Sequence, residues 1–415
     1  MKKENVEKKL KQVHLIVKYF LPVTAGIEVN MSETYSKLAT KNEWDITVHT
    51  SKDTHTEKNT LPDAEEIKGI KVKRYPYERF GYTPDIDWDK ADFVCLHNFN
   101  VFPHFFIMLA TIWRKILSKK HYALFLTPHG GFNPEWSIFP HGIREIKMLY
   151  HFTIGTLLIN LSVDGVRAVS EWEKHEMIKK GVNAAKIEVI DNGIEDDAYQ
   201  NVEELASQEI KAKVKELGDY IIQIGRIYVI KNYETVIDAL AKTPKNLKYV
   251  IVGGVEKNYH DNYKSKLDEQ IKKLGLEDRV IFLGIVRGVD KYYLIKHAKM
   301  MVHMALWESF CNVVHEGLSQ GLPCIVANNT ALPFLIKDKV NGFCVETKDS
   351  DAVAEKINYV LENYGSNEIQ EMRERNRVYG LKNSWKNVSE NMYKFYNKTF
   401  DKIHNIKTEK TMMKQ

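Results

Sequence analysis

The chain has 415 residues, of which 44% are hydrophobic and 28% are charged. These proportions are typical of a soluble globular protein rather than a disordered chain, and the length favours two domains over one. With 60 basic and 55 acidic residues the net charge is only +5, so the composition gives no reason to expect a nucleic-acid partner.

The N-terminal segment combines lysines with a short apolar run, as secretory signal peptides do. Because Lys18 interrupts the run and no clear cleavage site follows, VHLIV (13–17) is predicted to be the first strand. No stretch reaches the ~18 uninterrupted apolar residues of a membrane-spanning helix. The four cysteines lack CxxC spacing, so we expect buried free thiols in a reducing cytoplasm.

Short apolar runs alternate with longer helical patterns in the first half of the chain. A helix is predicted after Gly26, where EVNMSETYSKLATK has apolar residues spaced for one helix face. Continuous apolar strands separated by helices are typical of a mainly parallel sheet covered on both faces. The strands predicted in this half cover residues 13–17, 45–50, 70–75, 92–97, 122–127, 166–170 and 186–190.

The pattern pauses at Asp191-Asn192-Gly193 and is then repeated. The sequence therefore predicts an α/β protein with two doubly wound, Rossmann-like domains, joined by a hinge near 195–215. The carboxyl ends of their strands are expected to face a central cleft, where ligands bind. The second series of predicted strands covers residues 220–225, 248–254, 279–284, 300–304, 323–328 and 342–346.

The domain boundaries follow from these two series. We place the N-terminal domain at 1–196 and the C-terminal domain at 197–383. An amphipathic helix at 384–404, with aromatic residues on one face, is expected to pack back on the N-terminal domain. Residues 405–415 have no periodic pattern and are expected to be disordered.

A glycine and two cations follow the first strand of the second series, in IGRIYVIKN (224–232). Gly225 allows the backbone to approach a ligand closely, and Arg226 and Lys231 add positive charge beside it. Arginine binds oxygen atoms in a fork and lysine acts as a point charge, so this loop suits a diphosphate. The alternative is a surface loop with two solvated charges.

Two glutamates with seven residues between them bracket the start of a predicted helix in ESFCNVVHE (308–316). The amide groups around Cys311 and Asn312 lie at the positive end of the helix dipole and form an anion site. Glu316 lies about one turn further, where a phosphate would repel it unless it bound hydroxyl groups. Glu308 would then lie beside the group beyond the diphosphate. The alternative is that both carboxylates cap the helix.

Several motifs, in the same order, resemble those of glycosyltransferase family 4, over about residues 13–400. The resemblance implies a GT-B fold and a retaining transferase that takes a sugar from a nucleoside-diphosphate donor. It also implies that the C-terminal domain holds the donor and the N-terminal domain the acceptor. The motifs are the pair Glu308 and Glu316, GRIYVIKN, DNGIEDDAY (191–199), VSEWEKHEMIKKG (169–181) and AGIE (25–28).

The resemblance assigns donor-site roles to residues of the second half. It implies diphosphate contacts for Arg226 and Lys231, a sugar contact for Glu308 and a ribose contact for Glu316. Cys311 stands where the family commonly has glycine, which questions the backbone path at this position. Backbone contacts with the donor are implied for Gly225, Phe310, Cys311 and Asn312.

Two further site residues belong to the first half. His129 in TPHGG (127–131) matches the family's histidine near the reacting sugar, and Gly26 matches a glycine beside the donor phosphate. A structural histidine is the alternative for His129. The catalytic set implied by the resemblance is His129, Arg226, Lys231 and Glu308.

No metal and no cofactor are expected besides the donor substrate, a UDP- or GDP-sugar. DIDWD (85–89) has the D-x-D pattern of metal sites in other glycosyltransferases, but it lies in the acceptor half, far from the donor motifs. Positive charge at the diphosphate is already supplied by Arg226 and Lys231, so a metal is unnecessary.

The segment FPHFFIMLATIWRKILSKKH (102–121) predicts a helix with aromatic residues and a basic end. Such a helix can anchor a protein at an anionic lipid surface. The alternative is an interior helix whose basic end is solvated. The basic residues are Arg114, Lys115, Lys119, Lys120 and His121.

Together these features predict a cytoplasmic hexosyltransferase in contact with the inner surface of the membrane. It would move a sugar to a glycan or lipid-linked acceptor in the assembly of cell-surface polysaccharides. One alternative, a non-catalytic two-lobed binding protein, leaves the cations and carboxylates of one lobe unexplained. The other is a GT-B phosphorylase or epimerase, but the sequence shows neither a pyridoxal-phosphate lysine motif nor a hydroxyl-rich epimerase site.

Overall fold

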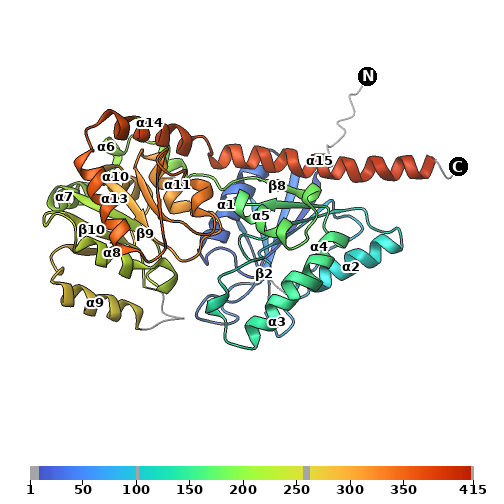
Figure 1. Cartoon of the computed structure of the whole chain (residues 1–415). Coiled ribbons are helices and arrows are strands. Elements are labelled where there is room, and N and C mark those ends of the chain that lie inside the picture. The colour runs from blue at the N-terminus through green and yellow to red at the C-terminus, as the bar shows by residue number, and fades with distance from the viewer. Residues whose placement is uncertain (1–8, 100–101, 256–261, 413–415) are drawn as a thin grey trace, which may run out of the picture. The chain divides into compact units, whose positions relative to one another are not determined.

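The computed structural model describes residues 9–99, 102–255 and 262–412, and from residue 406 onward only the backbone (Figure 1). The chain divides into two compact units, Met1–Asn192 with Trp385–Gln415, and Gly193–Ser384. The division falls at Asn192 rather than at residue 196. Ile194 donates its amide proton to the carbonyl of Asn383, so the segments entering and leaving the second unit pair with each other inside it.

The first unit is built on a sheet of eight strands, in the order β3-β4-β2-β1-β5-β6-β7-β8. Neighbouring strands are parallel except for β3, which pairs antiparallel with β4 at one edge. All strands predicted in this half are present. Their bounds are β1 Lys11–Ile16, β2 Trp44–Ser51, β3 Ala64–Ile67, β4 Ile70–Tyr75, β5 Phe93–His97, β6 Ala123–Thr127, β7 Gly165–Ala168 and β8 Ile187–Val189.

Strand β3 was not predicted, because its sequence AEEI has no apolar alternation. Its side chains are exposed up to the half-buried Ile67, and its only partner in the sheet is β4. A strand held at an edge by backbone hydrogen bonds needs no buried face. Hydrophobic periodicity therefore carries no signal for it.

Helices cover both faces of this sheet. On one face, α1 and α15 share an apolar cluster with β1, β2 and β5; on the other, α2 and α4 do so with β5 and β6. The bounds are α1 Gly26–Ala39, α2 His104–Ile116, η1 Trp136–Ile138, α3 Ile143–Leu149, the π-helix η2 Tyr150–Gly155, α4 Thr156–Ser162, α5 Glu171–Lys179, η3 Ala184–Lys186 and α15 Trp385–Met412.

Helix α15 returns the chain to the first unit and lies against α1 (Figure 1). Trp385 and Tyr396 are buried there, and the ring of Trp44 stacks on Tyr396. The helix is longer than the predicted 384–404. Because Lys, Glu and Met favour helix, it continues to Met412 after its apolar face has ended, so much of the predicted disordered segment 405–415 is helical; residues 413–415 lie outside the described ranges.

The second unit has an all-parallel sheet of six strands in the order β11-β10-β9-β12-β13-β14. The predicted fold class, two doubly wound Rossmann-like units, is confirmed. The strands are β9 Tyr220–Ile224, β10 Lys248–Val252, β11 Val280–Gly284, β12 Met300–His303, β13 Cys324–Ala327 and β14 Gly342–Val345. The helical segments are η4 Asp196–Tyr199, α6 Val202–Leu205, α7 Gln208–Leu217, η5 Val229–Lys231, α8 Tyr233–Leu240, α9 Tyr263–Leu274, α10 Gly288–His297, α11 Asn312–Ser319, α12 Leu332–Leu335, α13 Ser350–Glu362 and α14 Asn367–Leu381.

Candidate functional site

The strand order of the second unit places the donor motifs. The order reverses between β9 and β12, and ligands of doubly wound sheets bind at such a switch point, beyond the carboxyl ends of the strands. The loop with Gly225, Arg226 and Lys231 follows β9, and the loop with Glu308 follows β12. Motifs that are about 80 residues apart in sequence therefore meet at one edge of the sheet.

Gly253, at the end of β10, holds the loop after β9 in place. A Cβ at this position would lie 1.9 Å from the carbonyl oxygen of Gly225, so only glycine allows the two backbones to approach this closely. The Gly225 amide donates to the carbonyl of Val252, at 2.9 Å. The loop is thus fixed by backbone contacts with the end of β10.

Lys231 and Glu308 form an ion pair at this edge. Nζ of Lys231 lies 2.5 Å from Oε1 of Glu308, and both side chains are about 85% buried. Burial alone would raise the pKa of Glu308, but Lys231 and a hydrogen bond from His303 outweigh it and lower this pKa to about 2. Burial alone would lower the pKa of Lys231, but Glu308 outweighs it and the pKa is raised. Both groups are therefore charged at neutral pH.

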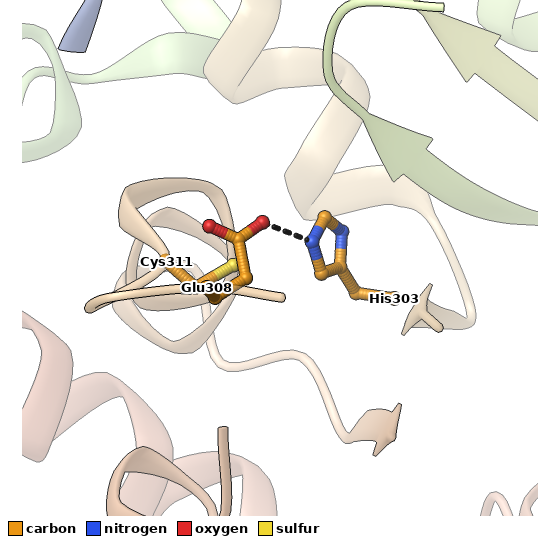
Figure 2. A group of neighbouring side chains, drawn as sticks. All are labelled: His303, Glu308 and Cys311. Atoms are coloured by element: carbon orange, nitrogen blue, oxygen red, sulfur yellow. Dashed lines mark hydrogen bonds and ion pairs between the residues drawn. The ribbon is translucent and has the colours of Figure 1, made fainter. Parts of the chain in front are cut away.

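His303, at the end of β12, is a further member of this cluster that sequence reasoning missed (Figure 2). Its Nε2 lies 2.9 Å from Oε1 of Glu308, and burial lowers its pKa. The neutral ring must then carry its proton on Nε2 and donate it to the carboxylate. Apolar residues are expected throughout a buried strand such as MMVHM. The presence of a histidine in this strand was therefore the one sequence feature that could have indicated His303.

His303, Glu308 and Cys311 together have the ligand chemistry of a metal site, since their ligand atoms lie within 4.8 Å of one another (Figure 2). The ammonium group of Lys231, however, already neutralises the Glu308 carboxylate. A divalent cation bound there would lie against a buried like charge, which is electrostatically unfavourable. The cluster is better suited to an anionic or hydroxylated ligand.

Cys311 precedes helix α11, at the position where the family commonly has glycine. Its backbone is left-handed, with φ of 80°, a conformation that favours glycine. The chain keeps this path with a cysteine, at a strain of about 1–3 kcal/mol. Among the described residues, no hydrogen bond from the amides of Phe310 and Cys311 to another residue is formed. An anion site at the start of α11 stays a prediction.

Glu316, on helix α11, lies in a second charged group. Lys291 of α10 lies 3.1 Å from its Oε1 and 2.7 Å from Oε2 of Glu195. Burial raises the pKa of Glu316, with Lys291 opposing this shift. Its other oxygen, Oε2, is buried and has no hydrogen-bond partner among the described residues. Glu195 lies in the DNGIEDDAY motif, whereas no sequence signal indicated Lys291.

Arg226 lies outside the buried ion pair. Its side chain is exposed, and its guanidinium group lies 5.1 Å from the centre of the Tyr228 ring. Of the predicted diphosphate pair, the structure therefore joins Lys231 to Glu308 and leaves Arg226 at the surface of the unit.

In the first unit, His129 follows β6 and takes a left-handed backbone conformation, with φ of 52°. Nε2 of His129 lies 3.0 Å from Nδ1 of His97. The turn is held by Glu173 of α5, which accepts hydrogen bonds from the amides of Gly130 and Val169. Burial raises the pKa of Glu173 to about 7. Glu173 lies in the motif VSEWEKHEMIKKG (169–181), but no sequence pattern indicated that it would hold this turn.

Gly26 is the first residue of α1, whose N-terminal amides carry the positive end of the helix dipole. No atom lies within 4 Å of the position that a Cβ would take there, so space remains beside it. Glu28 accepts a hydrogen bond from the Ala25 amide, at 3.0 Å, and closes the first turn.

The three aspartates of DIDWD form separate ion pairs. Asp85 pairs with Lys73, Asp87 with Lys90 and Asp89 with Arg114. Asp85 and Asp87 have lowered pKa values because these lysines hydrogen-bond to them. Each carboxylate therefore pairs with a different cation at the surface of the first unit.

Models of known protein families match both units of the chain. The model of "Glycosyl transferases group 1" matches residues 206–380, and that of "Glycosyltransferase Family 4" matches residues 25–198. An uncharacterized glycosyltransferase of Methanocaldococcus jannaschii is 31% identical over 217 residues, which cover 50% of this chain and 54% of that protein. A UDP-Gal:α-D-GlcNAc-diphosphoundecaprenol α-1,3-galactosyltransferase of Escherichia coli is 27% identical over 179 residues, 41% of this chain and 44% of that protein.

The matched stretches thus span about half the length of these two relatives. Among solved structures, HepE of Anabaena in complex with UDP superposes with a TM-score of 0.72 at 17% identity, and the match covers 94% of this chain and 100% of that one. This likeness supports the GT-B fold. The two family models match most of each unit, and the chain belongs to glycosyltransferase family 4.

Proposed function

We propose that this protein is a retaining, metal-independent hexosyltransferase that takes its sugar from a nucleoside-diphosphate donor. The observation that carries the proposal is the switch point of the second unit, where a buried ammonium group, a carboxylate and the start of a helix lie together. Phosphate oxygens accept from Lys231 and the α11 amides, and sugar hydroxyls donate to Glu308.

Glu316 is the proposed ribose contact. A buried carboxylate oxygen without a partner is unfavourable unless a ligand supplies a donor, and the hydroxyl groups of a ribose are such donors. Lys291 holds the other oxygen of Glu316 and so fixes the orientation of the carboxylate.

We expect the donor to be a UDP-sugar. The solved structures that resemble this chain include complexes of HepE with UDP and with UDP-glucose, and the E. coli relative is named for UDP-Gal. Thermal unfolding with UDP, GDP and ADP tests the nucleotide, because a ligand at 100 times its Kd stabilises by about 2.7 kcal/mol. No shift with any nucleoside diphosphate would contradict the proposal.

The reaction is proposed to retain the anomeric configuration, and this proposal is supported by the membership of glycosyltransferase family 4. When the diphosphate departs, negative charge develops on its oxygen atoms. These oxygens are expected to bind Lys231, Arg226 and the amides of Phe310 and Cys311. Preorganised donors stabilise such charge best in the transition state. Proton NMR of the first product formed from an α-linked donor tests this step. A β-linked first product would refute retention.

The acceptor is proposed to be lipid-linked and met at a membrane surface. The E. coli relative is named for an acceptor on diphosphoundecaprenol. No helix in the described part of the chain has the length and apolar content to cross a bilayer. A surface contact is instead supported by large apolar side chains that are exposed on α2, α3, η2 and α4 of the first unit. They are Phe106, Leu109, Trp113, Ile116, Ile143, Ile146, Leu149, Ile154, Leu157 and Leu161.

The proposed contact rests on apolar side chains rather than on the basic end of α2. Much of the basic end of α2 is engaged within the protein, because Arg114 pairs with Asp89, while Lys115 and Lys120 pair with Asp164. Apolar side chains therefore dominate the exposed face. Cations flank them elsewhere: Lys147 lies over the ring of Phe139, at 4.1 Å, and Lys180 over the ring of Phe152, at 4.3 Å.

Sedimentation with liposomes tests this surface. Trp113 is 62% exposed and Ile146 is 71% exposed, so their joint replacement by serine should reduce binding without opening the core. Val378→Ser is the matched control, since Val378 is 67% exposed on α14 of the second unit. If Trp113→Ser/Ile146→Ser sediments like the wild type, the membrane contact is refuted.

A further inference from the structure

A file of hydrogen-bonding side chains leads from His129 into the core of the first unit. Nε2 of His129 lies 3.0 Å from Nδ1 of His97, and Nε2 of His97 lies 2.9 Å from the hydroxyl of Tyr35. The Tyr35 hydroxyl in turn lies 2.8 Å from the hydroxyl of Tyr396. Both tyrosines also hydrogen-bond to the thiol of Cys95. We call His129, His97, Tyr35 and Tyr396 the relay.

The relay joins four elements that are distant in sequence. His129 follows β6, His97 ends β5, Tyr35 lies on α1 and Tyr396 lies on α15, whose return to the first unit Figure 1 shows. His97, Tyr35 and Tyr396 have no exposed surface, whereas His129 is partly exposed. Water is therefore excluded from all but one end of the relay, and the inner groups can satisfy one another only by fixed hydrogen bonds.

All four groups are neutral at physiological pH. Burial lowers the pKa of His97 and of His129 well below the ordinary value, and Arg167 adds to both shifts. Burial raises the pKa of Tyr35 and of Tyr396 well above the ordinary value. Each hydrogen bond in the relay then holds one proton, so the two histidines have only two proton arrangements between them.

The two arrangements differ in what His129 offers to a ligand. In one, Tyr396 donates to Tyr35, Tyr35 to Nε2 of His97, and Nδ1–H of His97 to Nε2 of His129, which leaves a proton on Nδ1 of His129. In the other, both hydrogen bonds of His97 are reversed and Nδ1 of His129 is an acceptor. A phenol is a better donor than acceptor and the imidazole nitrogen is a good acceptor, so the first arrangement is favoured.

We propose that His97, Tyr35 and Tyr396 are positioning residues that hold His129 as its Nδ1–H tautomer. This inference rests on the proposed function, because it takes His129 to contact the donor. His129 then presents a neutral hydrogen-bond donor, which suits an acceptor oxygen of a sugar or phosphate. The tautomer of His129 is thus set by buried residues of the first unit, and α15 contributes to it through Tyr396.

The tautomer can be measured without any activity. Two-bond ¹H–¹⁵N correlation spectra of the full chain labelled at histidine distinguish Nδ1–H from Nε2–H, and His129→Gln identifies the signal of His129. We expect Nδ1–H in the wild type and a shift toward Nε2–H in Tyr35→Phe. Nε2–H in the wild type, or an Nδ1–H signal unchanged in Tyr35→Phe, would overturn the proposal even if the transferase activity is as proposed.

Tyr122→Phe is the matched control. Tyr122 is fully buried in the same unit and hydrogen-bonds to Thr111, outside the relay. It reports the effect of removing a buried phenol hydroxyl in general, and it should leave the His129 signal unchanged.

Kinetics give a second, independent readout. Tyr35→Phe should lower kcat about tenfold with little change in KM for the donor, because a misoriented group acts mainly on the chemical step. His97→Asn keeps an amide donor near the Nδ1 position and should retain most of kcat, whereas His97→Leu should lose it. Equal losses in His97→Asn and His97→Leu, with equal melting temperatures, would contradict a positioning role. Absence of transfer in the wild type would instead refute the proposed function and leave the NMR test standing.

Discussion

Two buried glutamates, one in each unit, show how a direct partner decides the charge of a carboxyl group. Glu308 in the second unit has the ammonium group of Lys231 at 2.5 Å, and its pKa falls to about 2. Glu173 in the first unit accepts from two backbone amides and has no ion pair among the described residues, so burial raises its pKa to about 7. At these two positions the second unit thus keeps a charged carboxylate, while the first raises the pKa of its glutamate to about 7.

This difference matches the ligand groups proposed for each unit. A diphosphate carries charge and needs cations that are held ready, as Lys231 is held by Glu308. A sugar carries hydroxyl groups and needs neutral donors and acceptors with fixed orientation, as the relay behind His129 supplies. Four experiments test this difference between the two units.

The largest expected effect is that of Lys231→Ala. It should lower turnover by about 100-fold to 1,000-fold, because one preorganised contact to the departing charge is lost. It also leaves the Glu308 carboxylate buried without its cation, so the pKa of Glu308 should rise. Steady-state kinetics with the sugar donor measure the first effect. Lys242→Ala is the control, since Lys242 pairs with Asp351 at the exposed surface of the same unit, and a Lys231→Ala enzyme as active as this control would refute the assignment.

The second effect concerns stability and pH in the first unit. The pKa of Glu173 rises from 4.5 to about 7 on folding, so its contribution to stability is fully present below pH 4.5 and is lost as the pH rises toward 7. The loss is at most about 3 kcal/mol. The difference in melting temperature between the wild type and Glu173→Gln should therefore shift in favour of the variant from pH 4.5 to 7.5. Glu171→Gln, on the exposed face of the same helix, should show no such trend.

A smaller effect is expected for Glu316→Gln. The amide keeps the shape but exchanges one acceptor oxygen for a donor, so the affinity for a nucleoside diphosphate should fall about tenfold. The loss should appear mainly in binding, because ribose contacts persist from the ground state to the transition state. Isothermal titration calorimetry measures it, with the exposed Glu277→Gln as control. Equal affinities in the two variants would remove Glu316 from the ribose site.

The smallest effect is expected from a chelator. With Lys231 holding the carboxylate of the His303, Glu308 and Cys311 cluster, EDTA should leave the transfer rate within about twofold. A rate abolished by EDTA and restored by magnesium or manganese would show that a metal, and not Lys231 alone, neutralises the diphosphate.

Much of the fold could be predicted because buried parallel strands are continuous apolar runs. VHLIV, YIIQI and the other runs needed no tertiary information, and their alternation with helices indicated two doubly wound units. The polar edge strand β3 and the extension of α15 to Met412 were missed, since neither buries a periodic apolar face.

For the site, the sequence by itself determined the residues next to strand ends: Gly225, Lys231 and Glu308 follow β9 and β12, and the parallel topology brings such ends together. Only the tertiary structure decided their charges and partners. His303 beside Glu308, Lys291 beside Glu316, and Tyr396 behind His129 come from distant segments or from the interior of strands, where a polar residue has no periodic signature. Burial and a partner within 3 Å set a pKa or a tautomer, and both depend on packing that no local pattern encodes.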